Sequence, residues 1–120
     1  METATLTEVR DGVKCIEMMP AAEDALYIIA GKWKVRILMA LGMGDKRFNE
    51  LQRALSGISA RVLSNELKDL ELNGLVTKQT LANGTILYVR NDYADSLRGV
   101  MSELAKWGLL HKQKIRNREI

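Results

Sequence analysis

Residues 76–90 contain the feature that most limits how this chain can fold. Two short runs, Val76–Leu81 and Thr85–Arg90, are rich in Val, Thr, Ile and Tyr, and they flank Ala82-Asn83-Gly84. Asn-Gly is the strongest short hairpin signal, because both residues tolerate the positive φ angles of a tight turn. We therefore predict one antiparallel hairpin. Since the rest of the chain has helical periodicity, the expected fold is mainly α with a small β-hairpin (α+β).

An amphipathic helix is predicted directly before this hairpin. Ser59 is a suitable N-cap, and Asn73-Gly74 marks the end of the helix. Three leucines recur at helical spacing on one face: Leu63, Leu67 and Leu70. A different face carries side chains suited to phosphates and base edges, namely Arg61, Ser64, Asn65 and Lys68. The plain alternative is a solvated polar face, and composition alone favours that alternative.

The order of the other elements favours DNA recognition by this face. Helices are predicted at residues 21–30, 34–41, 47–55 and 92–115, with Pro20 in the first turn of the first and Asn91 capping the last. Helices followed by a hairpin in this order are typical of a winged helix-turn-helix. We expect one domain over residues 1–120, with an arm (1–20), a winged helix-turn-helix core (21–91) and a C-terminal dimerisation helix (92–120).

The apolar stripe of the last helix is longer than a small core can cover. We expect part of it to form a homodimer interface, although it could instead pack on the first helix. Leu97, Val100 and Leu104 begin this stripe, and Trp107 and Leu110 continue it.

Charge is distributed unevenly along the chain, whose net charge is +3. Residues 1–24 hold two Lys/Arg against six Asp/Glu, whereas residues 25–90 hold ten against five. A basic middle is expected where a domain meets phosphate, so double-stranded DNA is the favoured partner. The acidic first segment leaves open a winged helix that binds proteins and not DNA.

Several function classes lack their usual signals. One cysteine, one histidine and no Cys-x-x-Cys pair predict no metal site, and we expect no cofactor. No P-loop or Ser-His-Asp set indicates an enzyme. No apolar stretch approaches the roughly 20 residues of a membrane-spanning helix, so we expect no membrane partner and a cytoplasmic protein.

Three motifs resemble the HxlR-type winged-helix regulators, relatives of the MarR-type repressors. They are Gly31-Lys32-Trp33, Arg47-Phe48-Asn49-Glu50-Leu51, and Gly57-Ile58-Ser59-Ala60-Arg61-Val62-Leu63-Ser64, within a resemblance that covers about residues 19–108. The resemblance implies a homodimeric transcription regulator, with repression as the favoured outcome, on a near-palindromic operator. It also implies dimerisation through the first and last helices, with the hairpin wing on flanking DNA.

The expected DNA contacts extend beyond the helix that begins at Ser59. By analogy Arg47 contacts a phosphate, with a salt bridge to Glu50 as the alternative. Arg90 replaces an apolar residue of the family pattern, and it either projects to DNA or pairs with Asp92. The full expected set is Arg47, Ser59, Arg61, Ser64, Asn65, Lys68, Lys78, Asn83 and Arg90.

Control of this regulator is left open by a departure from the family. Many members carry a Cys-Pro pair where this chain has Met19-Pro20, and Cys15 lies four residues upstream. Lys14 would favour a reactive thiolate at Cys15, and Glu17 would oppose it. Cys15 is therefore either a redox sensor or an unreactive thiol, and a small-molecule effector remains a further possibility.

Overall fold

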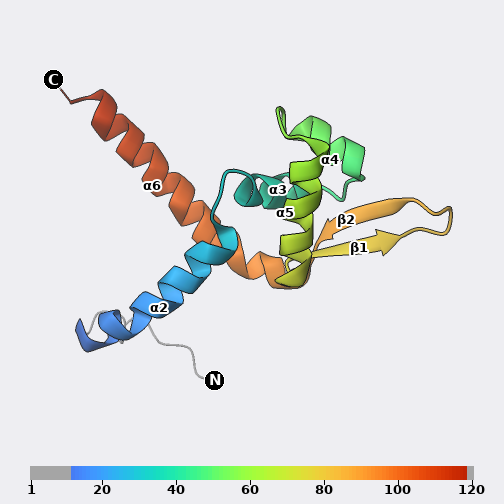
Figure 1. The fold of residues 1–120 in the computed structure, drawn as a ribbon. Coiled ribbons are helices and arrows are strands. Elements are labelled where there is room, and N and C mark those ends of the chain that lie inside the picture. Colours follow the sequence, from blue (N-terminus) through green and yellow to red (C-terminus); the bar gives the residue numbers. More distant parts are fainter. Residues whose placement is uncertain (1–11, 119–120) are drawn as a thin grey trace. The chain divides into compact units, whose positions relative to one another are not determined.

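The computed structural model describes residues 12–118, with side chains from Ile16 onward, and the chain divides into two units after Gly31. The first unit contains helix α2, Gly12–Ile29 (Figure 1). Pro20 lies inside this helix, so its predicted position in the first turn was wrong. The Lys, Glu and Met residues before Pro20 favour a helix, and they extend it upstream although proline removes one backbone donor.

The second unit contains the remaining elements in the predicted order, as Figure 1 shows. They are α3 (Lys34–Gly42), α4 (Phe48–Ala54), α5 (Ala60–Leu72), β1 (Val76–Thr80), β2 (Ile86–Arg90), the 3-10 helix η1 (Asp92–Leu97) and α6 (Arg98–Arg116). The fold is mainly α with a two-stranded antiparallel hairpin, which confirms the winged helix-turn-helix prediction.

The segment after the hairpin differs from the single long helix that the sequence predicts. Its first six residues form η1, and the α-helix begins only at Arg98. Asn91 Oδ1 accepts a hydrogen bond from Ala94 N at 3.0 Å, which confirms the predicted cap, and Ser96 Oγ donates to Tyr93 O at 2.6 Å. The Ser96 hydroxyl supplies Tyr93 O with a donor that a continuous α-helix would take from the backbone.

The core of the second unit lies where α3, α4, α5 and the base of the hairpin meet. Its fully buried large side chains are Ile37, Leu38, Leu51, Leu63, Leu67 and Leu70. The leucine face predicted for α5 is therefore the face that packs inward, and α5 presents its polar face to solvent.

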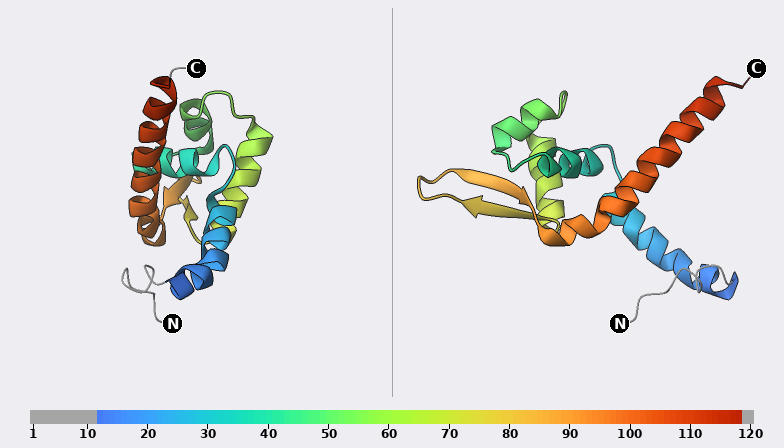
Figure 2. Two further views of the ribbon diagram at one scale, coloured as in Figure 1. Left: turned by 90° about the vertical axis from the view of Figure 1, so that its left-hand side faces the viewer. Right: turned by 180° about the vertical axis from the view of Figure 1, so that it is seen from behind.

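The hairpin extends outward from these helices, as the right-hand view in Figure 2 shows. Val76 pairs with Arg90 at its base and Thr80 with Ile86 near its tip. Gly84 has φ +86°, a conformation that glycine adopts without steric cost. Asn83 Oδ1 accepts from Thr85 N at 3.0 Å, so the Asn-Gly turn forms as predicted.

Candidate nucleic-acid interface

Helix α5 presents the predicted polar face. Ser59 Oγ accepts a hydrogen bond from Val62 N at 3.1 Å, which confirms the predicted N-cap. Arg61, Asn65 and Lys68 are exposed, and Ser64 is half-buried. Among residues 16–118, no hydrogen bond or ion pair engages these four side chains. Their donors and acceptors are therefore available to an external polar surface.

The far end of α5 is fixed by a glycine cap. Gly74 has φ +75° and donates to Glu71 O at 3.0 Å, while Leu75 N donates to Leu70 O at 2.9 Å. These two hydrogen bonds form a Schellman motif, in which Leu75 is the residue after the glycine and is buried. The cap sets the direction in which the chain leaves α5 for β1, and so it sets where the wing starts.

Helix α4 and its turn complete the helix-turn-helix. Gln52 Nε2 donates to Ile58 O at 3.2 Å and ties α4 to the turn before α5. A shallow groove of about 580 Å³ lies on this turn, and its lining includes Asn49, Arg53 and Ser56. Sequence reasoning did not single out these three polar residues, although Asn49 lies inside a quoted motif.

Arg47, at the start of α4, forms the alternative interaction that the sequence left open. Its Nε lies 3.2 Å from Glu50 Oε1, and its backbone N donates to the same oxygen at 2.9 Å. The backbone hydrogen bond and then the guanidinium lower the pKa of Glu50 from its ordinary value. The Arg47 side chain is more than half exposed although it is paired with Glu50.

The wing is attached to the helix-turn-helix by a contact that the sequence did not indicate. Lys46 N donates to Tyr88 O at 3.2 Å, and Tyr88 N donates to Lys46 O at 2.8 Å. On the wing, Lys78 is exposed, and its Nζ lies 5.9 Å from the centroid of the Tyr88 ring. Lys78 is thus the cation that β1 presents beside α5, whereas Asn83 serves the turn itself.

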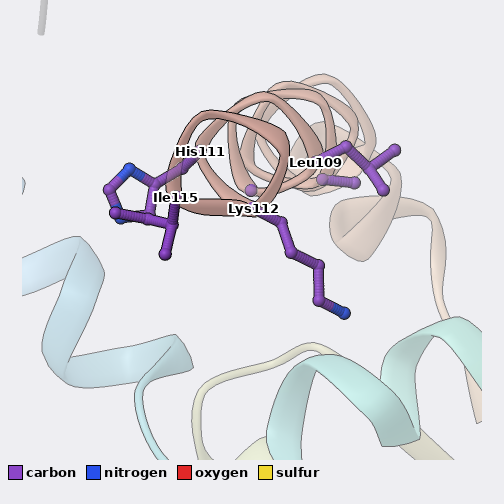
Figure 3. A pocket seen from close by; sticks show the side chains of 6 residues that line it. Leu109, His111, Lys112 and Ile115 are labelled. Carbon is purple, nitrogen blue, oxygen red and sulfur yellow. The ribbon is translucent and has the colours of Figure 1, made fainter. Parts of the chain in front are cut away.

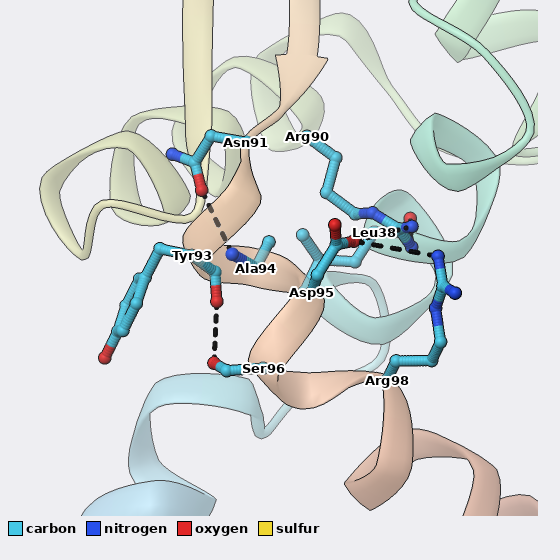
Figure 4. Close-up of polar contacts among 8 residues, drawn as sticks. All are labelled: Leu38, Arg90, Asn91, Tyr93, Ala94, Asp95, Ser96 and Arg98. Carbon is cyan, nitrogen blue, oxygen red and sulfur yellow. Dashed lines mark hydrogen bonds and ion pairs between the residues drawn. The ribbon is translucent and has the colours of Figure 1, made fainter.

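Arg90 does not occupy the position predicted for it. Its guanidinium pairs with Asp95 at 3.1 Å rather than with Asp92, and it donates to Leu38 O at 3.5 Å (Figure 4). Only 13% of its side chain is exposed. Because this cation is engaged inside the fold, Arg90 is removed from the set of DNA contacts and becomes a structural link of the wing.

A second partly buried cation, Lys34, fixes α5 on α3. Lys34 Nζ lies 2.8 Å from Glu66 Oε2 and 3.4 Å from Asp69 Oδ2. Burial lowers the pKa of Lys34, but the hydrogen bonds and charges of Glu66 and Asp69 outweigh that effect and raise it overall. The lysine is therefore charged throughout the neutral range.

Comparison with known proteins identifies this arrangement. The family described as HxlR-like helix-turn-helix matches residues 28–116. The chain belongs to the HxlR family. YvaP of Bacillus subtilis, an HTH-type transcriptional regulator, is 36% identical over 93 residues, which cover 76% of this chain and 86% of YvaP.

Solved structures agree with the HxlR assignment. A protein described as a MarR-family transcriptional regulator of Enterococcus faecalis is 32% identical with a TM-score of 0.70, and the match covers 97% of this chain and 100% of that one. The redox regulator HypR, in its reduced form, has a TM-score of 0.73 at 26% identity, covering 82% and 99%. This HxlR-family chain is a transcriptional regulator of the helix-turn-helix, MarR-like type, and its relatives are regulators and not enzymes.

The prediction for Cys15 falls partly outside the described residues. Cys15 lies in α2, but its side chain is outside the described residues, so its reactivity stays a prediction. From Gly12 to Arg118, no helix has the length and apolar character to cross a bilayer. Among the side chains of residues 16–118, no three that could ligate a metal lie close together.

Proposed function

We propose that this protein is a homodimeric, sequence-specific DNA-binding repressor that inserts α5 into the major groove of a near-palindromic operator. One observation carries the proposal: α5 buries its leucine face completely and leaves Arg61, Asn65 and Lys68 exposed and without partners among residues 16–118. An α-helix fits the major groove, and in a helix-turn-helix the second helix enters it.

Within this surface, we assign base contacts and phosphate contacts to different side chains. Arg61 can bond the O6 and N7 atoms of guanine, Asn65 can bond adenine bidentately, and Ser64 can bond either. Lys68 on α5 and Lys78 on β1 are cations that suit phosphates. Specificity is therefore assigned to Arg61 and Asn65, and most of the affinity to the lysines.

Exposed apolar residues on α6 support the dimer. Val100, Leu104 and Trp107 are 47%, 47% and 64% exposed, and they share one helix face. Beside them Gly108 leaves a shallow depression that Leu109 and Ile115 help to line (Figure 3). A face of this kind is costly to leave in water, and a second copy of the helix would cover it through an interface with twofold symmetry. Two copies then present two α5 helices to one operator.

The test is fluorescence anisotropy with labelled duplexes from the region upstream of the gene and a scrambled duplex of equal length. The unmodified protein should prefer the upstream DNA, and its affinity should fall with salt. Asn65→Ala should cost about 1–3 kcal/mol on the preferred sequence alone. Lys78→Ala should weaken both duplexes and reduce the salt slope by about 1.

The matched control is Arg116→Ala, which removes one positive charge from the exposed surface of α6. It should leave affinity and salt slope close to those of the unmodified protein. Equal effects of Asn65→Ala and Lys78→Ala on every duplex would refute the division between the two elements. Binding with no preference between upstream and scrambled DNA would refute sequence-specific recognition itself.

A further inference from the structure

Tyr88, in the middle of β2, has a lysine beside it on each side. Its backbone exchanges two hydrogen bonds with Lys46, which precedes α4, and its cross-strand partner in β1 is Lys78. A strand residue directs both of its backbone groups to the same side, so Tyr88 and Lys78 form a non-hydrogen-bonded pair, the kind whose side chains lie closer together. Directly opposed residues of antiparallel strands have their side chains on the same face. Lys46, Tyr88 and Lys78 therefore form one row across three segments of the chain.

The tyrosine ring is held in this row by an aromatic neighbour. The ring centroids of Tyr88 and Phe48 lie 6.4 Å apart, and the ring planes are inclined at 57°. This geometry is within the range of favourable aromatic pairs. Phe48 is the first residue of α4. Lys78 Nζ lies 5.9 Å from the centroid of the Tyr88 ring, which is the distance of a cation–π contact. The ring thus contacts both α4 and the cation of the wing.

Neither lysine of the row is neutralised by a carboxylate. Among residues 16–118, no ion pair involves Lys46 or Lys78. Lys46 Nζ makes one long hydrogen bond, of 3.4 Å, to Gly44 O, and Lys78 is exposed. By contrast Arg47, next to Lys46 in the chain, is paired with Glu50. Two ammonium groups on one face without a carboxylate partner favour an anionic ligand.

We propose that the row of Lys46, Tyr88 and Lys78 is a binding site for the phosphates of one DNA strand. Lys46 and Lys78 bind neighbouring phosphates, because cations on adjacent segments can follow one backbone. Tyr88 is a positioning residue, whose ring holds the Lys78 ammonium on the face that Lys46 shares. The identity of the ligand rests on the proposed function, whereas the alignment of Lys78 by Tyr88 is a property of the free protein.

The first test measures the affinity for the scrambled duplex at several salt concentrations by fluorescence anisotropy, because phosphate binding does not depend on sequence. Lys46→Ala should reduce the salt slope by about 1 and weaken binding about five- to tenfold at about 0.1 M salt. The two hydrogen bonds of Lys46 with Tyr88 are backbone bonds, so this variant keeps the wing attached. Arg116→Ala, a control of equal charge on α6, should change neither quantity.

The second test concerns Tyr88 and begins without DNA. In NMR spectra of the free full-length protein, the ring current of Tyr88 should shift the ε-methylene protons of Lys78 upfield. Tyr88→Phe keeps the ring and should keep this shift, and Tyr88→Leu should abolish it. Tyr88→Leu should also bind the scrambled duplex about two- to fivefold more weakly, while Tyr88→Phe binds like the unmodified protein. In the Tyr88→Leu background, Lys78→Ala should weaken binding by a smaller factor, which a purely structural role would not produce.

Each contrary result has its own meaning. A salt slope of Lys46→Ala equal to that of Arg116→Ala would overturn the site while leaving DNA binding intact. Equal loss of affinity in Tyr88→Phe and Tyr88→Leu, or unshifted Lys78 protons, would overturn the positioning role. If Tyr88→Leu unfolds, the shift in the unmodified protein and in Tyr88→Phe decides that role, and Lys46→Ala decides the site. Failure of the unmodified protein to bind either duplex would refute the proposed function and the phosphate site together.

Discussion

Lys34→Met is the substitution whose effect the structure defines most closely. Lys34 begins α3, and its Nζ lies 2.8 Å from Glu66 Oε2 on α5. The two side chains are only 12% and 23% exposed. Methionine is close in length and preserves the packing of the lysine stem. The substitution therefore removes the ammonium group and leaves the Glu66 carboxylate largely buried without its cation.

The magnitude follows from the burial of this pair. A hydrogen bond to a charged group contributes about 1.5–3 kcal/mol, and a buried polar group left unpaired retains its desolvation cost. We expect Lys34→Met to reduce the free energy of unfolding by about 2 kcal/mol, because the stem remains packed. The contact with Asp69 adds little, since that carboxylate is 57% exposed and lies 3.4 Å away.

Urea unfolding at one fixed protein concentration measures this effect through two double-mutant cycles. The fixed concentration matters because a dimer is stabilised by mass action. Lys34→Met with Glu66→Gln should give a coupling energy of about 1–2 kcal/mol. Lys34→Met with Asp69→Asn should give less than about 0.5 kcal/mol. Equal coupling in both cycles, or a negligible effect of Lys34→Met alone, would refute the reasoning.

The dependence on pH has a definite sign. Since the folded-state pKa of Lys34 is raised, its contribution is fully present below the ordinary lysine pKa. It is lost only as the pH rises through the raised value. The destabilisation by Lys34→Met should therefore be constant across the neutral range and shrink only in strong alkali. A cost that fell between pH 6 and pH 8 would show that another group titrates.

Three further predictions concern caps and turns. Ser59→Ala removes the acceptor for Val62 N and should cost about 1 kcal/mol in urea unfolding. Gly84→Ala places a side chain at φ +86° and should cost about 1–2 kcal/mol, measured in the same way. The pKa of Glu50, followed by carboxyl NMR, should lie below its ordinary value and return towards it in Arg47→Ala, although the backbone bond persists. The stability from this pair is present above the unfolded-state pKa of Glu50 and is lost as the pH falls through the folded-state value.

The elements that the sequence predicts well are those with local signals. Ser59 and Gly74 fix the two ends of α5 through bonds to residues within four positions in the chain. Asn83 and Gly84 define the hairpin turn in the same local way. Leucines at helical spacing identify the buried face of α5, because that face has to pack against the rest of the core.

The contacts that the sequence does not predict join residues far apart in the chain. Lys34 and Glu66 are separated by 32 positions, and Arg90 and Leu38 by 52. Charge pairing of this kind has many possible partners, and only the packing of α3 against the hairpin and α5 selects among them. The ion-pair partner of Arg90, Asp95, lies only five positions away and was missed for a local reason. Asp92 is nearer in sequence, but the turn of η1 brings Asp95 to the guanidinium.

These long-range contacts explain how two separate elements could meet one DNA duplex. The wing is joined to the start of α4 by the Lys46–Tyr88 backbone bonds, and Asn91 Nδ2 donates to Gly74 O at 2.6 Å, at the end of α5. The base of β2 is therefore connected to both helices of the helix-turn-helix. A hairpin tethered only by the chain would sweep a wide range of positions beside α5. Because of these attachments, a structural change at the base of the wing would change the position of the whole wing relative to α5. The carboxylate of Asp95, which Arg90 and Arg98 share, lies next to that base.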